Sequence, residues 1–223
     1  MALASESFDT IVIGSGFGGV MAAYPLVMAG ERVLMLERGD WVERGPHNWE
    51  INSAHELSDH YCPDTAYAVD DARRKRQGGS FHCVGGPSVF YGGVALRLRE
   101  QDFDPGPAIV TDSGAEWPFG YDELAPFYDW AETLLGVAGD DRDDPTAPAR
   151  DAPYPQAPAR FTPPAQRVAD AARRLGLKPF PLPLAINYAP SDDRAACTLC
   201  CTCDGFACAI GAKNDLATGL IPM

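Results

Sequence analysis

The N-terminal part of the chain has the clearest pattern of apolar and polar positions. Thr10 to Ile13 is a short β-branched, apolar run that stops at Gly14, which predicts a strand buried on both faces. An apolar segment with helical spacing follows and reaches Gly30, a residue typical of a helix end. Pro25 lies inside this segment and lacks a helical amide donor, so we expect a kink or an early end near Tyr24.

A glycine-rich turn joins this strand to this helix. Gly14, Gly16 and Gly19 fit the pattern G-x-G-x-x-G. In that pattern the first glycine allows a tight turn, the second lets backbone approach a pyrophosphate, and the third lets the helix pack on the strand. Val33 to Leu36 predicts a second strand, and Glu37 stands at its end, where a carboxylate binds ribose hydroxyls. Because all these parts follow in register, they indicate a dinucleotide site rather than a purely structural turn.

The end of the second strand bears on which dinucleotide is bound. Glu37-Arg38-Gly39 resembles the E-R-G ending of FAD-binding domains with the glutathione reductase type of fold. NAD remains an alternative, and Arg38 alone is weak evidence for a 2′-phosphate. The candidate cofactor-binding residues of this unit are Gly14, Ser15, Gly16, Phe17, Gly18, Gly19, Glu37 and Arg38.

A second glycine-rich stretch lies between Cys83 and Arg99. Gly85-Gly86 and Gly92-Gly93 bracket a short apolar segment, and such glycines often mark the close approach of another backbone or a flat ligand. Apolar and other residues then alternate from Val94 to Arg99, which predicts a loop followed by a half-buried strand.

This stretch resembles the flavin loop of glucose-methanol-choline (GMC) oxidoreductases, whose usual form is close to L-G-G-S-S-x-x-N-G-x-x-x-x-R. Pro87 and Tyr91 depart from that form, and Tyr91 replaces the usual asparagine. The matching residues are Gly85, Gly86, Ser88, Gly92 and Arg97. The flavin-loop residues that the resemblance implies are Gly85, Gly86, Ser88, Tyr91, Gly92 and Gly93.

Two further segments carry the same resemblance. The first unit matches the family's N-terminal FAD motif, and Glu116 to Leu124 resembles its W-P-x-x-Y-x-x-L segment. The resemblance implies an α/β fold: a Rossmann-like FAD-binding domain of the glutathione reductase type, with part of an α+β substrate lobe, in an incomplete fold. The expected boundaries are residues 1–110 for the FAD-binding domain, 111–190 for the partial lobe and 191–223 for a cysteine-rich return to the FAD domain.

The rest of the chain contains two predicted helices and several irregular segments. Helical spacing predicts a helix from Trp117 to Ala138 and a short one from Ala165 to Leu175, closed by Gly176. Residues 140–164 are acidic and proline-rich, which favours an extended connection. Leu182 to Ile186 predicts an edge strand limited by prolines.

The segment from Asp40 to Ala72 is rich in aromatic residues and histidine but has no clear period. We interpret it as an irregular excursion whose aromatics pack the loop, with cofactor cover as the alternative. The basic run Arg73 to Arg76 is interpreted as a solvated turn, with phosphate contact as the minority case. The histidines have no metal-ligand spacing, and each is interpreted as a surface or core residue: His47, His55, His60 and His82.

Five cysteines lie close together near the C-terminus, in the order C-x-x-C-C-x-C-x-x-x-x-C from Cys197 to Cys208. This spacing fits neither the paired zinc form nor a standard ferredoxin run, so we predict metal-free, packed thiols. A metal or iron–sulfur cluster and a disulfide remain alternatives. The stretch that ends in Gly211-Ala212-Lys213 also resembles GMC-like bacterial sequences, some of which carry a cluster nearby.

Composition and charge exclude several classes of protein. The chain has 223 residues and a net charge of −13, which argues against nucleic acid, since that partner needs a basic footprint. No apolar run is long enough to span a bilayer, and residues 1–8 lack the pattern of a targeting segment, so we expect a cytoplasmic protein with no membrane span.

The GMC resemblance implies hydride transfer from an alcohol CH–OH group to FAD, with a small-molecule alcohol as substrate. Proton abstraction needs a base, usually histidine, and GMC enzymes place theirs far downstream in a C-terminal half with no counterpart here. We therefore leave the catalytic residue unassigned and expect an inactive N-terminal portion, whose partner is the missing part in cis or as a second chain. The alternatives are a subunit of an iron–sulfur sugar or alcohol dehydrogenase, and a non-catalytic nucleotide-binding fragment.

Overall fold

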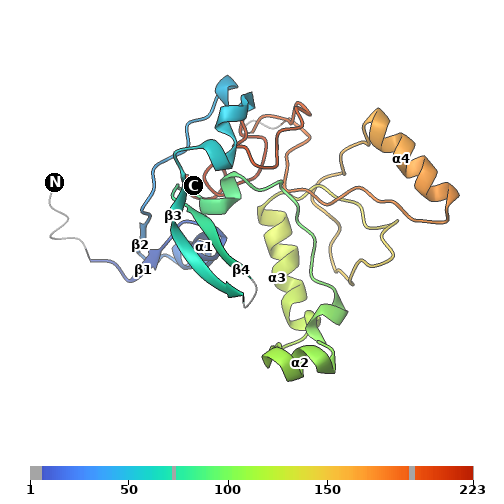
Figure 1. The fold of residues 1–223 in the computed structure, drawn as a ribbon, viewed down its shortest axis with the longest axis horizontal. Coiled ribbons are helices and arrows are strands. Elements are labelled where there is room, and N and C mark those ends of the chain that lie inside the picture. Colours follow the sequence, from blue (N-terminus) through green and yellow to red (C-terminus); the bar gives the residue numbers. More distant parts are fainter. Residues whose placement is uncertain (1–6, 72–73, 191–193, 223) are drawn as a thin grey trace. The chain divides into compact units, whose positions relative to one another are not determined.

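The computed structural model describes residues 7–71, 74–190 and 194–222, with residues 64–71 and 74–78 described by their backbone alone. The chain divides into two compact units. Unit 1 comprises Met1–Gly93 and Thr198–Met223, and unit 2 comprises Val94–Cys197. The elements of both units are shown in Figure 1.

Unit 1 begins with the predicted strand, helix and strand. β1 (Thr10–Ile13) pairs in parallel with β2 (Val33–Leu36), and α1 (Phe17–Met28) connects them. Both strand predictions are confirmed to the residue. The connection is compact because Gly14 turns with φ +95° and Gly30 closes the helix with φ +88°, values that only glycine adopts at little cost.

Two predictions for this unit are wrong in detail. The early end of α1 near Tyr24, one of the two outcomes expected at Pro25, does not occur. The helix continues through Pro25 to Met28, because buried Val20 and Ala23 hold it in place and proline removes only one of its hydrogen bonds. β1 is not buried on both faces, since Ile11 is 61% exposed and Ile13 is 83% exposed. The sheet has only two strands in the described part of the chain, so nothing there covers these side chains.

The segment after β2 is more regular than its sequence suggests. Short 3₁₀ turns at Pro46–Trp49, Ile51–Ser53 and His55–Leu57 lead into β3 (Tyr61–Asp71), which pairs antiparallel with β4 (Arg74–Phe81). The interpretation of residues 61–71 as an irregular excursion is therefore wrong, because backbone pairing with β4 supplies order that side-chain periodicity does not encode. The same holds for the basic run from Arg74 onward, which lies in β4, whereas Arg73 is outside the described residues.

The core of unit 1 joins distant parts of the sequence. Cys83, Val89, Phe90, Ala207 and Ala217 form one buried cluster. The ring of Phe81 stacks on that of Phe90, with centroids 5.3 Å apart. This core packs the second glycine-rich stretch, which includes a 3₁₀ turn at Gly86–Val89, against the C-terminal segment.

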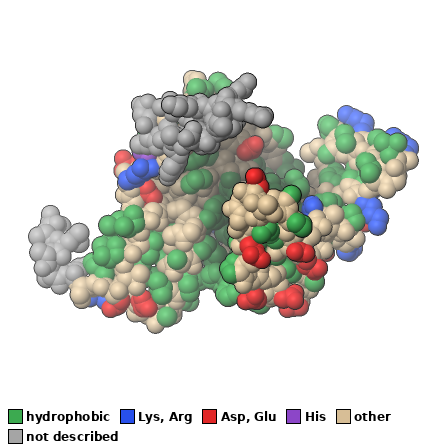
Figure 2. Space-filling view, turned by 60° about the horizontal axis from the view of Figure 1, so that its bottom comes forward, with side chains coloured by type: hydrophobic (Ala, Val, Ile, Leu, Met, Phe, Trp, Pro, Cys, Tyr) green, Lys and Arg blue, Asp and Glu red, His purple; other side chains and the backbone are tan. Residues whose placement is uncertain are grey.

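Unit 2 is mainly helical and irregular. A 3₁₀ turn at Glu100–Phe103 precedes α2 (Pro107–Ser113), α3 (Tyr121–Leu134) and α4 (Pro163–Arg174). α3 begins later than predicted, because Gly120 is its extended N-cap residue, and it ends where Gly136 takes φ +57°. The prediction of α4 and its closure at Gly176 is confirmed, although the helix begins two residues earlier than predicted. Basic side chains gather on α4 in Figure 2.

The predicted strand from Val94 to Arg99 is wrong, and so is its predicted burial pattern. Only an isolated bridge forms there, between Val94 and Leu184. Arg97 is 7% exposed, whereas Leu96 is 50% exposed. The arginine is inside because Arg97 Nε donates to Glu132 on α3 over 2.8 Å, and a buried charge is tolerated when it is paired.

The predicted edge strand from Leu182 to Ile186 also reduces to isolated bridges at Leu184, since the neighbouring prolines donate no backbone hydrogen bonds. Residues 140–162 contain no helix or strand, as predicted. The predicted connection is too long by two residues, because Pro163 and Pro164 begin α4. Among the described residues, no helix has the length and apolar character needed to cross a membrane.

Candidate cofactor site

The two glycine-rich stretches meet in unit 1. A Cβ atom on Gly86 would lie 3.3 Å from the Cα of Gly16, so the backbones touch where both residues lack side chains. Gly19 is equally constrained, because its Cβ would lie 1.9 Å from the carbonyl oxygen of Gly14. The positive φ of Gly14 and the close contact at Gly19 give the predicted first and third glycines the physical roles expected of them, which are a left-handed turn and close packing of helix on strand.

Ser15 links both stretches to the end of β2. Its side chain is buried, and its Oγ donates to Glu37 Oε2 over 2.7 Å while accepting from the amide of Gly85 over 2.9 Å. The Ser15 amide also donates to Glu37 Oε2, over 3.0 Å. One small side chain therefore fixes three predicted site residues relative to one another.

The carboxylate of Glu37 is held in its ionised form. Its Oε1 accepts from the amides of Arg38 and Gly39 at 2.8 and 3.1 Å. Burial raises the pKa of Glu37, but the hydrogen bonds from Ser15 and these two amides outweigh it and leave the pKa below its usual range. Because the chain already supplies four donors, a ribose hydroxyl would compete with Ser15 for Oε2.

The Arg38 side chain does not take part in the hydrogen bonds between Ser15 and Glu37 and contacts Ser80 instead. Its guanidinium donates to the hydroxyl of Ser80 over 2.6 Å in an exposed position. Beside it, Gly39 passes so close to the chain at His82 that a Cβ would lie 2.0 Å from the His82 carbonyl. This glycine therefore allows the chain after β2 to pass close to the start of the second stretch.

The N-terminus of α1 is open toward a ligand. Gly16 is the N-cap residue and supplies no side-chain cap. The amides of Phe17, Gly18 and Gly19 have no hydrogen-bond partner among the described residues. Uncapped amides at a helix N-terminus favour an anionic group such as a pyrophosphate.

The second glycine-rich stretch is fixed by the C-terminal segment. Ser88 Oγ donates to the Gly85 carbonyl over 2.7 Å and accepts from the Leu216 amide over 3.1 Å. The Tyr91 hydroxyl donates to the Asn214 carbonyl over 3.0 Å. The Tyr91 ring meets the Phe17 ring edge to face, with centroids 5.4 Å apart.

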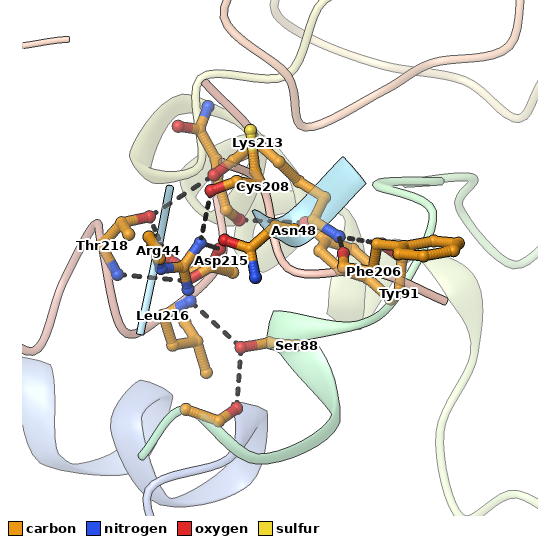
Figure 3. Close-up of polar contacts among 12 residues, drawn as sticks. Arg44, Asn48, Ser88, Tyr91, Phe206, Cys208, Lys213, Asp215, Leu216 and Thr218 are labelled. Carbon is orange, nitrogen blue, oxygen red and sulfur yellow. Dashed lines mark hydrogen bonds and ion pairs between the residues drawn. The ribbon is translucent and has the colours of Figure 1, made fainter. Parts of the chain in front are cut away.

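Lys213 and Asp215 complete this frame, as Figure 3 shows. Lys213 Nζ lies 2.7 Å from the Tyr91 carbonyl oxygen, and both carboxylate oxygens of Asp215 accept from Arg44, at 2.9 and 3.0 Å. Sequence reasoning missed Arg44 and Asp215 entirely. It noted Lys213 only as part of the stretch that resembles GMC-like sequences. No local pattern shows that a charged side chain will be buried among backbone groups from distant parts of the sequence.

Two of the histidines, His55 and His60, have structural surroundings. The ring of His55 packs among aromatics, 5.8 Å from those of Tyr61 and Phe81. A ring nitrogen of His60 lies 3.3 Å from the carbonyl oxygen of His82. Trp41 and Trp49 are 57% and 45% exposed, and the Tyr67 side chain is outside the described residues.

The cysteine-rich segment contains exposed thiols and strained backbone. Cys200 and Cys201 are exposed, and Leu199 and Cys201 have φ near +60°. Burial raises the pKa of Cys200, but hydrogen bonds from Thr202 and Trp49 outweigh it and lower the pKa. No group of three or more possible ligand side chains is arranged to hold a metal among the residues the structure describes.

Comparisons with known proteins give relatives over nearly the whole chain. No family model matches it. The chain is 39% identical over 228 residues to 6‴-hydroxyparomomycin C oxidase from Streptomyces lividus and 37% identical over 228 residues to paromamine 6′-oxidase from Streptomyces fradiae. It is 31% identical over 206 residues to 2-methyl-1,2-propanediol dehydrogenase from Mycolicibacterium austroafricanum.

These relatives are longer than the chain. The alignments cover 99%, 97% and 88% of this chain but only 39%, 38% and 36% of the respective relatives. Among solved structures, pyridoxine 4-oxidase from Mesorbium loti is similar with a TM-score of 0.54 and 21% identity, over 96% of this chain and 39% of that one. That similarity shows a shared mixed α/β fold.

Proposed function

We propose that this chain, which belongs to the glucose-methanol-choline oxidoreductase family and matches its N-terminal portion, is the FAD-binding part of an enzyme that oxidises an alcohol. The observation that carries the proposal is the meeting of the two glycine-rich stretches, connected by Ser15 to Glu37. Residues with no side chain there leave room for a flat dinucleotide, and an ionised carboxylate stands beside it.

The residues fit FAD in a definite way. The open amides at the start of α1 would hold the pyrophosphate, and Glu37, with Arg38 beside it, would bind at the adenosine end. The stretch Gly85 to Gly93 would lie against the flavin. FAD, when bound, supplies the acceptor for the hydride that leaves the alcohol carbon. The fold proposed for unit 1 is accordingly Rossmann-like, of the glutathione reductase type.

This chain's own residues bind and orient, and the base that takes the hydroxyl proton lies in the remaining part of the enzyme. What supports this division is the length of the relatives and the exposure of Ile11 and Ile13 on β1. We propose that further strands and helices from that remaining part, in cis or as a second chain, cover this sheet. Unit 2 would then belong to the substrate lobe.

For the substrate we propose a hydroxyl group of an amino sugar. The two most similar relatives reported above are named as oxidases of paromamine and of a hydroxyparomomycin. Such compounds are polycations at neutral pH, and the net charge of −13 favours their approach. A plain diol, as named for the third relative, is the alternative.

The test is Gly16→Val in the full-length protein. A Cβ on Gly16 meets only Pro87, at 3.9 Å, so the variant should fold, yet its side chain should occupy the space needed for backbone approach to the pyrophosphate. We expect at least a tenfold loss of FAD affinity (about 1.4 kcal/mol or more), measured by flavin absorbance and mass spectrometry of released cofactor.

The matched control is Gly18→Ala, which adds a Cβ to the same helical turn where nothing lies within 4 Å. It should keep its FAD. Stoichiometric FAD in purified Gly16→Val would show that the cofactor is held elsewhere.

A further inference from the structure

Lys213 is the largest of the fully buried side chains among the described residues, with 0% exposure. Its Nζ donates to the carbonyl oxygens of Tyr91 and Cys203 at 2.7 Å and of Phe206 at 2.8 Å. An ammonium group has three N–H donors and no acceptor, and the three carbonyl oxygens equal its donors in number. Figure 3 shows Nζ pointing toward the Tyr91 and Phe206 positions.

The hydrogen bonds of the Lys213 ammonium described above go to backbone carbonyl oxygens, and the nearby carboxylate of Asp215 is bonded to Arg44. Burial is the largest influence on the pKa of Lys213 and lowers it to about 8. The charge of Asp215 acts in the opposite direction, but both Asp215 oxygens are bonded to Arg44. An ammonium buried in this way is costly unless its hydrogen bonds are good, and the three hydrogen bonds described above go to peptide carbonyls.

One of those peptide groups belongs to the second glycine-rich stretch. The peptide between Tyr91 and Gly92 is trans, so its carbonyl and its N–H point in opposite directions. Since the carbonyl faces Lys213, the Gly92 amide faces away from it. That amide has no hydrogen-bond partner within the described part of the chain.

Tyr91 is held at further points, which keep this peptide from rotating. Its hydroxyl donates to the Asn214 carbonyl, and its ring contacts Phe17 of the first glycine-rich turn. The unpartnered Gly92 amide therefore has a fixed direction. A fixed donor in a half-buried loop beside the other glycine turn is suited to receive a ligand acceptor atom.

We propose that Lys213 is a positioning residue that fixes and polarises the Tyr91–Gly92 peptide, so that the Gly92 amide is a strong hydrogen-bond donor to the flavin of FAD. A hydrogen bond from an ammonium to a carbonyl increases the donor strength of the N–H on the same peptide. Reduced flavin is richer in electrons than oxidised flavin, so a stronger donor stabilises the reduced form more. The inference rests on the proposed function, because it requires bound FAD.

The experiment compares Lys213→Met with Lys178→Met, a change at an exposed lysine of unit 2, in the full-length protein. We expect Lys213→Met to lose about tenfold in its preference for reduced over oxidised FAD, which lowers the two-electron midpoint potential by about 30 mV. Lys178→Met should keep the wild-type potential. Lys213→Gln, which retains a neutral donor, should show a lower potential too and replaces Lys213→Met if that variant does not fold.

A measurement on the wild-type protein needs no variant. Hydrogen exchange of the peptide that contains Gly92 should slow when FAD is added to apoprotein, because the amide gains an acceptor. Unchanged exchange at Gly92 would overturn the inference, and so would a wild-type potential in both Lys213 variants. In both cases FAD would still be bound and the proposed function would stand, whereas a full-length protein without FAD would refute both.

Discussion

Four hydrogen bonds converge on the carboxylate of Glu37, two from Ser15 and one each from Arg38 and Gly39. The sequence places this acid correctly at the end of β2. It does not reveal that the Ser15 hydroxyl also accepts a hydrogen bond from the Gly85 amide. Glu37, which was expected only to bind ribose, therefore also holds the site residues together through its hydrogen bonds.

We expect the apoprotein to lose stability in acid through Glu37. Its pKa is lowered on folding from an ordinary value of 4.5, so its contribution is fully present above that value and is lost as the pH falls through the lower, folded pKa. The free energy of unfolding, measured in urea from about pH 6 to about pH 3, should therefore fall less steeply in Glu37→Gln. Equal slopes for wild type and variant would contradict the assignment.

At the scale of elements, α3 is organised by an arginine that comes from outside it. Arg97 donates to Glu132 and Asp129 on α3 and to the Tyr121 hydroxyl. Burial would lower the pKa of Arg97, but these partners outweigh it and raise the pKa. A second arginine, Arg150, also donates to Glu132, at 3.0 Å. The helix therefore packs through a charged network as well as through the buried ring of Tyr121.

We predict that Arg97→Met destabilises the protein by about 3–5 kcal/mol, since removing one partner leaves buried carboxylates with less compensation. Urea denaturation followed by circular dichroism measures the loss. Arg99→Met is the control, because Arg99 is exposed two residues away, and it should change stability by less than about 0.5 kcal/mol. Similar losses in both variants would mean that the network contributes little.

At the scale of the whole molecule, the sheet is narrow and its apolar residues are uncovered. β1 and β2 make a two-stranded sheet in the described chain, and Ile13 is 83% exposed. A groove of about 290 Å³ beside α1 is lined by apolar residues such as Val27, Met35 and Leu220. Surfaces of this kind usually mark an interaction site.

We accordingly expect the 223-residue chain alone to oxidise no alcohol and to bind FAD weakly. Activity should return when the rest of the enzyme is supplied in cis or as a second polypeptide, because the proton-accepting base is expected there. Flavin reduction by candidate alcohols, followed by absorbance under anaerobic conditions, is the measurement. Turnover by the chain alone that disappears on mutation of one of its own histidines would refute this division.

The sequence by itself determined the local backbone of several elements in both units. The bounds of β1 and β2, the glycine turn and the closure of α4 at Gly176 could all be read from residue types, because β-branched runs and left-handed glycines act within a few residues. The position of Glu37 at the end of β2 followed from the same order of strand, glycine turn, helix and strand.

Only the tertiary structure decided which charges are buried and what they hold. Arg97 was expected on the polar face of a strand, and Lys213 carried no signal of burial, yet both lie inside. Their environments depend on partners far along the chain, which are Glu132 for Arg97 and the carbonyl of Tyr91 for Lys213. Because a buried charge is tolerated only where such partners converge, no local pattern could have revealed it.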